Sequence, residues 1–182
     1  MKAHFSTIPR SLAHLVALGA LVCSVTAQAA DGCTVLLCLA GNWKNISQCR
    51  PPVEEMMRDV ARGLHFPGCE SGGNSAAGNR AIAASECPPQ YRTETLVESS
   101  IDYQCPFSSV IGVSVDGKPW SRTWWSASGD SVTEWLPAAR EAFAANPTEI
   151  DERFALDHAA WVAAQQAARV AADEAARQAG GA

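Results

Sequence analysis

The sequence predicts an α+β fold: a small disulfide-stapled domain with N-terminal helices, a three-stranded antiparallel sheet and a C-terminal alanine-rich helix. Three observations carry this prediction. Apolar residues recur at helical spacing before residue 65, and they alternate with polar residues in stretches between 96 and 125. Beyond residue 159, alanine dominates the chain. We expect a leader over 1–29, a cystine-rich core over 30–136 and a helical extension over 137–182.

The first 29 residues have the pattern of a secretory signal peptide. Lys2 and Arg10 form its basic region, residues 15–25 are apolar but too few to span a bilayer, and Ala27-Gln28-Ala29 offers a small-x-small cleavage site. We expect export to the periplasm and no transmembrane segment in the mature chain. Lipidation at Cys23 is the alternative, but a valine stands before that cysteine where a small residue is required.

The charge of the chain disfavours direct nucleic-acid binding. The whole sequence has 14 Lys and Arg against 19 Asp and Glu, a net charge of −5. The leader holds two of the bases and no acid, so its removal leaves the mature chain at −7. Without a run of Lys or Arg, such a surface repels phosphate backbones.

Cleavage also removes Cys23, which leaves an even number of cysteines, as expected of a chain that oxidises after export. The six are Cys33, Cys38, Cys49, Cys69, Cys87 and Cys105. Their spacings contain no Cys-x-x-Cys, and few histidines accompany them, so we predict structural disulfides and neither a metal nor a cofactor. Fifteen pairings are open. We expect Cys33 and Cys38 each to pair with a segment beyond Cys49, because long closed loops constrain the unfolded chain most.

Two helices are predicted before the sheet. The apolar run from Cys33 should form a short buried helix that ends near Gly41. A second helix should begin at Pro51-Pro52 and end at Gly63. Its apolar stripe consists of Val53, Met56, Met57, Val60 and Leu64.

The segment from Gly68 to Glu86 is rich in glycine and small residues, and it predicts a surface loop. Residues 96–105 alternate as in a half-buried strand. Residues 110–125 predict a hairpin around Asp116-Gly117, a dipeptide suited to a type I′ turn.

A two-residue loop sets the register of this hairpin. It pairs Val115 with Lys118, Val113 with Trp120 and Ile111 with Arg122, and we expect an edge strand at Pro119. The core face then collects Ile111, Val113, Val115, Trp120 and Trp124. Trp125 falls among small and polar residues on the other face.

Beyond the hairpin we expect a polar connection over 130–134 and a helix from Pro137 to about Ala145. A second helix should start near Thr148 and continue to about Gln178. Past Ala159 it offers little apolar area to bury, so it predicts a projecting tail.

The functional candidates are few. No Gly-x-Ser-x-Gly is present, the acids lie in helix first turns and on solvent faces, and we assign no catalytic residue. Trp125, with its neighbour Trp124, is the candidate for partner binding, since an aromatic on the polar side of a hairpin can anchor another protein. The alternative is that a C-terminal helix covers it.

The run Cys-Thr-Val-Leu-Leu-Cys-Leu-Ala-Gly at 33–41 resembles the mature N-terminus of the TrbM/KikA family of conjugal transfer proteins. The Cys49-anchored helix and the Asp-Gly-x-x-x-Ser-Arg-Thr-Trp-Trp hairpin at 116–125 are similar to that family too, so the resemblance spans about 33–135. It implies an exported accessory protein of bacterial conjugation, associated with a type IV secretion or mating-pair apparatus and acting on other proteins of that apparatus. The alternatives are a periplasmic cell-wall-acting enzyme and a small secreted binding or inhibitor module.

Overall fold

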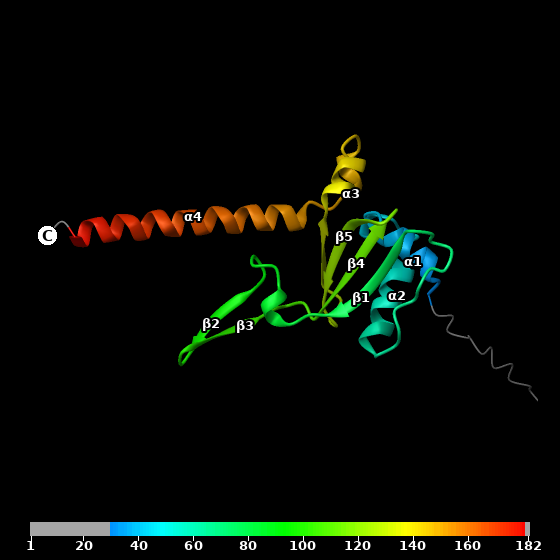
Figure 1. Ribbon diagram of the computed structural model, residues 1–182, viewed down its shortest axis with the longest axis horizontal. Helices are drawn as coiled ribbons and strands as arrows, with labels where there is room; N and C mark the ends of the chain where they lie inside the picture. The colour runs from blue at the N-terminus through cyan, green and yellow to red at the C-terminus, as the bar shows by residue number, and fades with distance from the viewer. Residues whose placement is uncertain (1–29, 181–182) are drawn as a thin grey trace, which may run out of the picture.

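The computed structural model describes residues 30–180, and the predicted signal peptide lies outside this range. The fold is α+β, with a four-stranded antiparallel sheet in the order β1-β4-β5-β6 and a separate two-stranded sheet, β2-β3 (Figure 1). The strands are β1 Ala76–Ala81, β2 Thr93–Val97, β3 Ser100–Gln104, β4 Ser109–Val115, β5 Lys118–Trp125 and β6 Ser131–Trp135. The helices are α1 Gly32–Leu39, α2 Arg50–Ala61, α3 Pro137–Ala142 and α4 Arg153–Gly180, with short 3₁₀ turns between them.

Both predicted N-terminal helices are present and form one layer over the sheet. Asp31 caps α1 through the Thr34 amide, and α2 begins with prolines in its first turn and stops before Gly63 at φ 87°. They bury a common core against the sheet, made of Val35, Leu36, Leu39, Val53, Met56, Met57, Ile111, Val113 and Trp125. Leu64, predicted in the buried stripe, is 56% exposed, because the chain has already left the helix.

The predicted hairpin is present, but its register shifts by one residue. Asp116 and Gly117 take the two positive φ angles of the expected turn, and Val115 pairs with Lys118. A β-bulge then adds Trp120 as an extra residue, so Val113 pairs with Ser121 rather than Trp120. The consequence is that Trp125, not Trp124, faces the helices with Ile111 and Val113.

Two segments predicted as loops are strands. Residues 76–81 form β1 by pairing along β4, although their small side chains bury little and gave no alternation. Residues 131–135 form β6, which pairs with β5 and makes β5 a central strand. Pro119 is tolerated there because it precedes the first β5–β6 pair, Ser121 with Trp135.

The strand predicted over 96–105 is instead part of a second hairpin. Val97 pairs with Ser100 across a tight turn in which Glu98 has φ 56°, and no residue of β2 or β3 is buried. This hairpin projects beside the main sheet in Figure 1.

The six cysteines of residues 30–180 all form disulfides: Cys33–Cys69, Cys38–Cys49 and Cys87–Cys105. The expectation for Cys33 is confirmed. The expectation for Cys38 is wrong, because the 3₁₀ turn at Trp43–Asn45 brings Cys49 back beside α1. Three disulfides indicate an oxidising compartment, either extracellular or periplasmic.

The C-terminal part begins with α3, which packs Ala139 against Trp135. After a short turn, α4 starts at Arg153, later than the predicted Thr148. Its first turns contact the domain through Phe154, while residues 163–180 are all exposed. As predicted, α4 projects away from the sheet (Figure 1).

Candidate functional site

Trp124 and Trp125, the predicted partner-binding residues, lie on opposite faces of the sheet and are both buried, with 6% and 2% of their surface exposed. Trp125 is covered by the N-terminal helices rather than a C-terminal helix, and its Nε1 donates to Asn79 Oδ1 at 2.8 Å. Trp124 packs with Phe107, Val110 and Val132. Neither indole is exposed as an anchor for a partner would be. A binding role for them stays a prediction. Each does border a groove.

The groove beside Trp125 lies between α2 and the loop that joins β5 to β6. Its volume is about 740 Å³, within the range of small-ligand sites. Trp43, Met57 and Trp125 provide its apolar wall, and the loop residues 126–129 provide serine hydroxyls and backbone.

The charged residues of this groove are mostly basic. Lys44, Arg50 and Arg58 line it together with a single carboxylate, Glu54. The chain as a whole is acidic, so this is a local reversal of charge. Lys44 donates to the Ser131 carbonyl oxygen, and burial lowers the pKa of its ammonium, an effect that the nearby Asp151 carboxylate opposes.

Two buried polar atoms of the groove residues lack a hydrogen-bond partner in the described part of the chain. They are Trp43 Nε1, on a side chain with 6% exposure, and Ser131 Oγ, on a residue with 1% exposure. The N–H groups of Gln90, Trp124 and Trp135 are also unpaired among the described residues, so the two groove atoms add to the evidence from charge and apolar wall and do not single out this groove by themselves.

A second groove borders Trp124 on the opposite face of the sheet. Its two arginines are already neutralised, because Arg80 pairs with Glu86 and Arg122 pairs with Glu134. It therefore lacks the net positive charge of the groove beside Trp125.

The β2-β3 hairpin has one apolar and one polar face. Directly opposed residues share a face, which groups Leu96 with Ile101 and Glu94 with Tyr103. The Arg92 guanidinium lies 4.5 Å from the Tyr103 ring centre and pairs with Glu94. Leu96 and Ile101 are 74% and 52% exposed, so nothing in residues 30–180 covers this face.

The opposite face of the hairpin is polar. It carries Thr93, Thr95, Ser100, Asp102 and Gln104, with Val97 as its single aliphatic residue. The alternation over 96–105 predicts a single strand and therefore misses this amphipathic hairpin. The available signal was the polar run Glu98-Ser99-Ser100, which interrupts the apolar residues.

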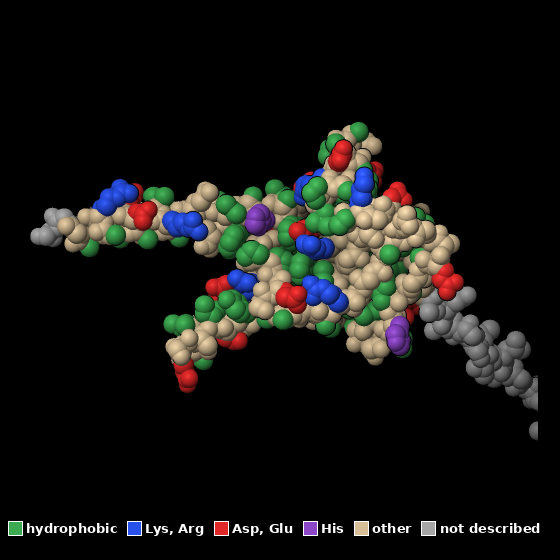
Figure 2. Space-filling model, viewed as in Figure 1, with side chains coloured by type: hydrophobic (Ala, Val, Ile, Leu, Met, Phe, Trp, Pro, Cys, Tyr) green, Lys and Arg blue, Asp and Glu red, His purple; other side chains and the backbone are tan. Residues whose placement is uncertain are grey.

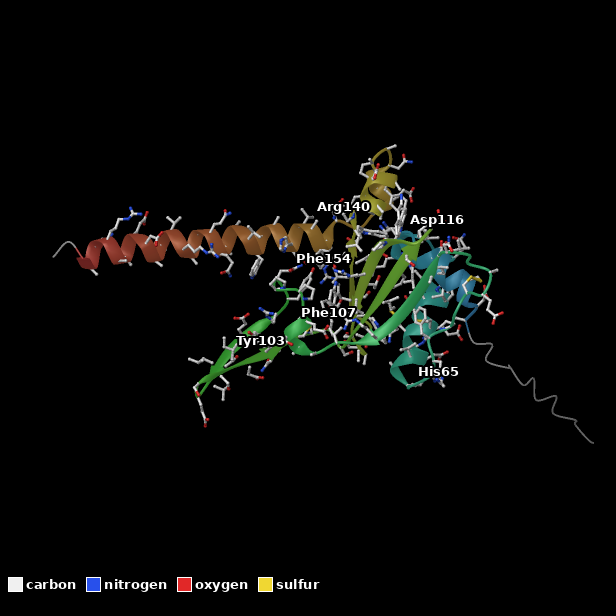
Figure 3. All side chains as sticks on the ribbon, in the orientation of Figure 1. His65, Tyr103, Phe107, Asp116, Arg140 and Phe154 are labelled. Carbon is white, nitrogen blue, oxygen red and sulfur yellow. A yellow bond between two sulfur atoms is a disulfide. The ribbon has the colours of Figure 1, made fainter. Side chains whose placement is uncertain are left out.

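The hairpin and α4 meet at an aromatic hub. The ring of Tyr91 packs edge-on against Phe107 and at a tilt against Phe154, and its hydroxyl donates to Asp157 Oδ2 at 2.7 Å. Burial, and then this hydrogen bond, raise the pKa of the Tyr91 phenol above its usual range. Figure 3 shows Phe107 and Phe154 near the junction and Tyr103 out on the hairpin.

From this hub the two elements extend to the same side of the molecule, as two arms with an open notch between them (Figure 2). Hydrophobic side chains of the hairpin are visible on its side toward α4. On α4, His158 stacks on Trp161 at 5.9 Å between ring centres, and Leu156 is 67% exposed.

Among residues 30–180, no cluster of three or more His, Cys, Asp or Glu is placed to hold a metal ion. Over the same residues, no helix is both long and apolar enough to cross a membrane. Comparison with protein-family models, curated proteins and solved structures finds no match to this chain.

Proposed function

We propose that this protein is an exported accessory protein of bacterial conjugation that acts by binding another protein of the mating-pair or type IV secretion apparatus in the periplasm. The assignment to conjugation rests on the sequence resemblance at 33–41 and 116–125. The uncovered apolar face of the β2-β3 hairpin is the single structural observation that supports a protein-binding role.

An isolated two-stranded hairpin is marginally stable in water, and this one places Leu96 and Ile101 on a face that nothing in residues 30–180 covers. Such a face is typical of an interaction site when it is rimmed by charge, as the Arg92–Glu94 pair rims this one. Its polar opposite face, by contrast, suits permanent contact with solvent.

We assign the occupant to a segment of an apparatus protein that enters the notch between the arms. The notch is open in Figure 2, and on α4 the side chains of Asp157 and His158 reach Tyr91 and Gln90 at its base, with Trp161 stacked on His158. Among the described residues no strand pairs with either outer edge of the hairpin, which allows an extended segment to add as a further strand.

Photocrosslinking in donor cells tests this assignment. A photoreactive amino acid at Leu96 should link the protein to an apparatus component, identified by mass spectrometry, whereas the same group at Thr95, on the polar face, should not. A Leu96 adduct with a second copy of this chain, or with a protein not encoded among the transfer genes, would contradict the proposal.

A further inference from the structure

We propose that the groove beside Trp125 binds a short acidic peptide segment, with side-chain carboxylates held by Lys44, Arg50 and Arg58. This site lies apart from the hairpin arm and does not depend on the function proposed above. The argument rests on the charge, the wall and the unpaired polar atoms of the groove.

The positive charge of the groove indicates a negatively charged ligand. Three cations and one carboxylate line the groove in a chain whose acids outnumber its bases. Arg50 already uses its Nε on the Lys44 carbonyl oxygen at 2.6 Å, which holds its guanidinium beside the groove. Arg58 makes no ion pair within the described residues, so its guanidinium is free to bind a carboxylate with two parallel hydrogen bonds.

The wall and the unpaired atoms favour a peptide over a small inorganic anion. Trp43, Met57 and Trp125 give an apolar surface that an anion alone would leave unused, but that aliphatic side chains would cover. The indole N–H of Trp43 and the hydroxyl of Ser131 are donors without a partner, and a small shift of either side chain would let it bind a peptide carbonyl.

A nucleic acid is the less suitable ligand. Three cations on an otherwise acidic chain give too little phosphate neutralisation to overcome the repulsion from the rest of the surface. We therefore treat oligonucleotide binding as an outcome that the test has to exclude.

The test measures the anisotropy of a fluorescein-labelled Ala-Glu-Leu-Glu-Ala peptide titrated with the oxidised protein purified from the periplasm. We expect saturable binding that weakens with added salt, and a glutamine counterpart that binds at least about tenfold more weakly. Arg58→Gln should weaken binding about tenfold. Ser128→Glu, an added negative charge on an exposed loop residue, should weaken it as well.

Arg62→Gln is the matched control, because Arg62 follows the same helix, carries the same charge and lies outside this groove. It should leave the peptide affinity unchanged, as should Leu96→Asp on the hairpin arm. The proposal is overturned if no binding occurs up to about 1 mM protein, or if the glutamine peptide binds equally well. It is also overturned if Arg62→Gln weakens binding as much as Arg58→Gln, or if phosphate or a single-stranded oligonucleotide of equal charge competes as well as the unlabelled peptide.

Discussion

The Tyr91 hydroxyl donates a 2.7 Å hydrogen bond to the Asp157 carboxylate, which ties the segment before the β2-β3 hairpin to the base of α4. The two residues are 66 positions apart in the sequence. Because both arms leave the domain at this contact, their relative position depends on it together with the packing of Tyr91 on Phe107 and Phe154.

Tyr91→Phe should keep the ring packing and lose the hydrogen bond. The contact is partly exposed, so we expect the free energy of unfolding to fall by only about 1 kcal/mol at neutral pH. Urea denaturation followed by circular dichroism measures this change. An unchanged midpoint would show that the hydroxyl contributes nothing to docking.

The same contact predicts a pH dependence. The folded state raises the pKa of Tyr91 above its usual value of 10.0, so it holds a proton that the unfolded chain releases. The stability that this provides is fully present below pH 10 and declines as the pH rises above it. Urea titrations at increasing pH should therefore show the difference between wild type and Tyr91→Phe shrinking above pH 10. A difference that grew instead would contradict the assigned direction of the shift.

Gly32→Ala should destabilise the fold. A Cβ at Gly32 would lie 2.0 Å from the Gly68 carbonyl oxygen, a backbone atom held in place beside the Cys33–Cys69 disulfide. We expect the free energy of unfolding to fall by at least about 2 kcal/mol, because close-packed backbone atoms can move apart only at a high energetic cost. Gly112→Ala is the matched control, because a Cβ there meets no atom within 4 Å. Equal unfolding midpoints for the two variants would contradict this packing.

The Cys87–Cys105 disulfide should hold the hairpin arm to the domain. It closes a separation of 18 residues around the β2-β3 hairpin, and Cys87 is buried against Phe107 and Val110. Replacing both cysteines by serine should cost about 3 kcal/mol. Hydrogen exchange should then accelerate over residues 84–104, whereas the Cys38→Ser, Cys49→Ser pair should accelerate exchange over α1 and α2. The same exchange pattern in both double variants would show that the two bridges do not stabilise separate parts.

Removal of residues 163–182 should leave the domain as stable as before. Every described residue beyond Val162 is exposed, and the α4 contacts with the hub come from its first turns. We expect the free energy of unfolding, measured by tryptophan fluorescence, to change by less than about 0.5 kcal/mol. A loss of more than about 2 kcal/mol would mean that the distal helix packs on the domain.

Local patterns were sufficient to predict the helices, the Asp116-Gly117 turn and the disulfide-bonded character of the chain. The disulfide partner of Cys38 was not accessible, because it depends on how far the chain turns at Trp43–Asn45. Strand β1 could not be predicted either, because its alanines and glycine pair with β4 through the backbone and bury little side-chain area.

The site was less predictable than the fold. The bulge at Trp120 places Trp124 and Trp125 each on the opposite face of the sheet from the one predicted. Trp120 turns out of the ladder to donate to the Ala40 carbonyl oxygen at 2.7 Å and to pack on Phe143. Both contacts are long-range, so the spacing of apolar residues within the hairpin does not indicate them.

The most direct test of the proposed function is the mating efficiency of a donor strain that lacks this gene and is complemented by defined variants. We predict that wild type and Thr95→Lys restore plasmid transfer, and that the Leu96→Asp, Ile101→Lys double variant does not. The double variant removes the apolar face, while the opposed charges at 96 and 101, and at 95 and 102 in the control, keep the strand pairing favourable. Normal transfer by the deletion strain, or full complementation by the double variant, would contradict the account.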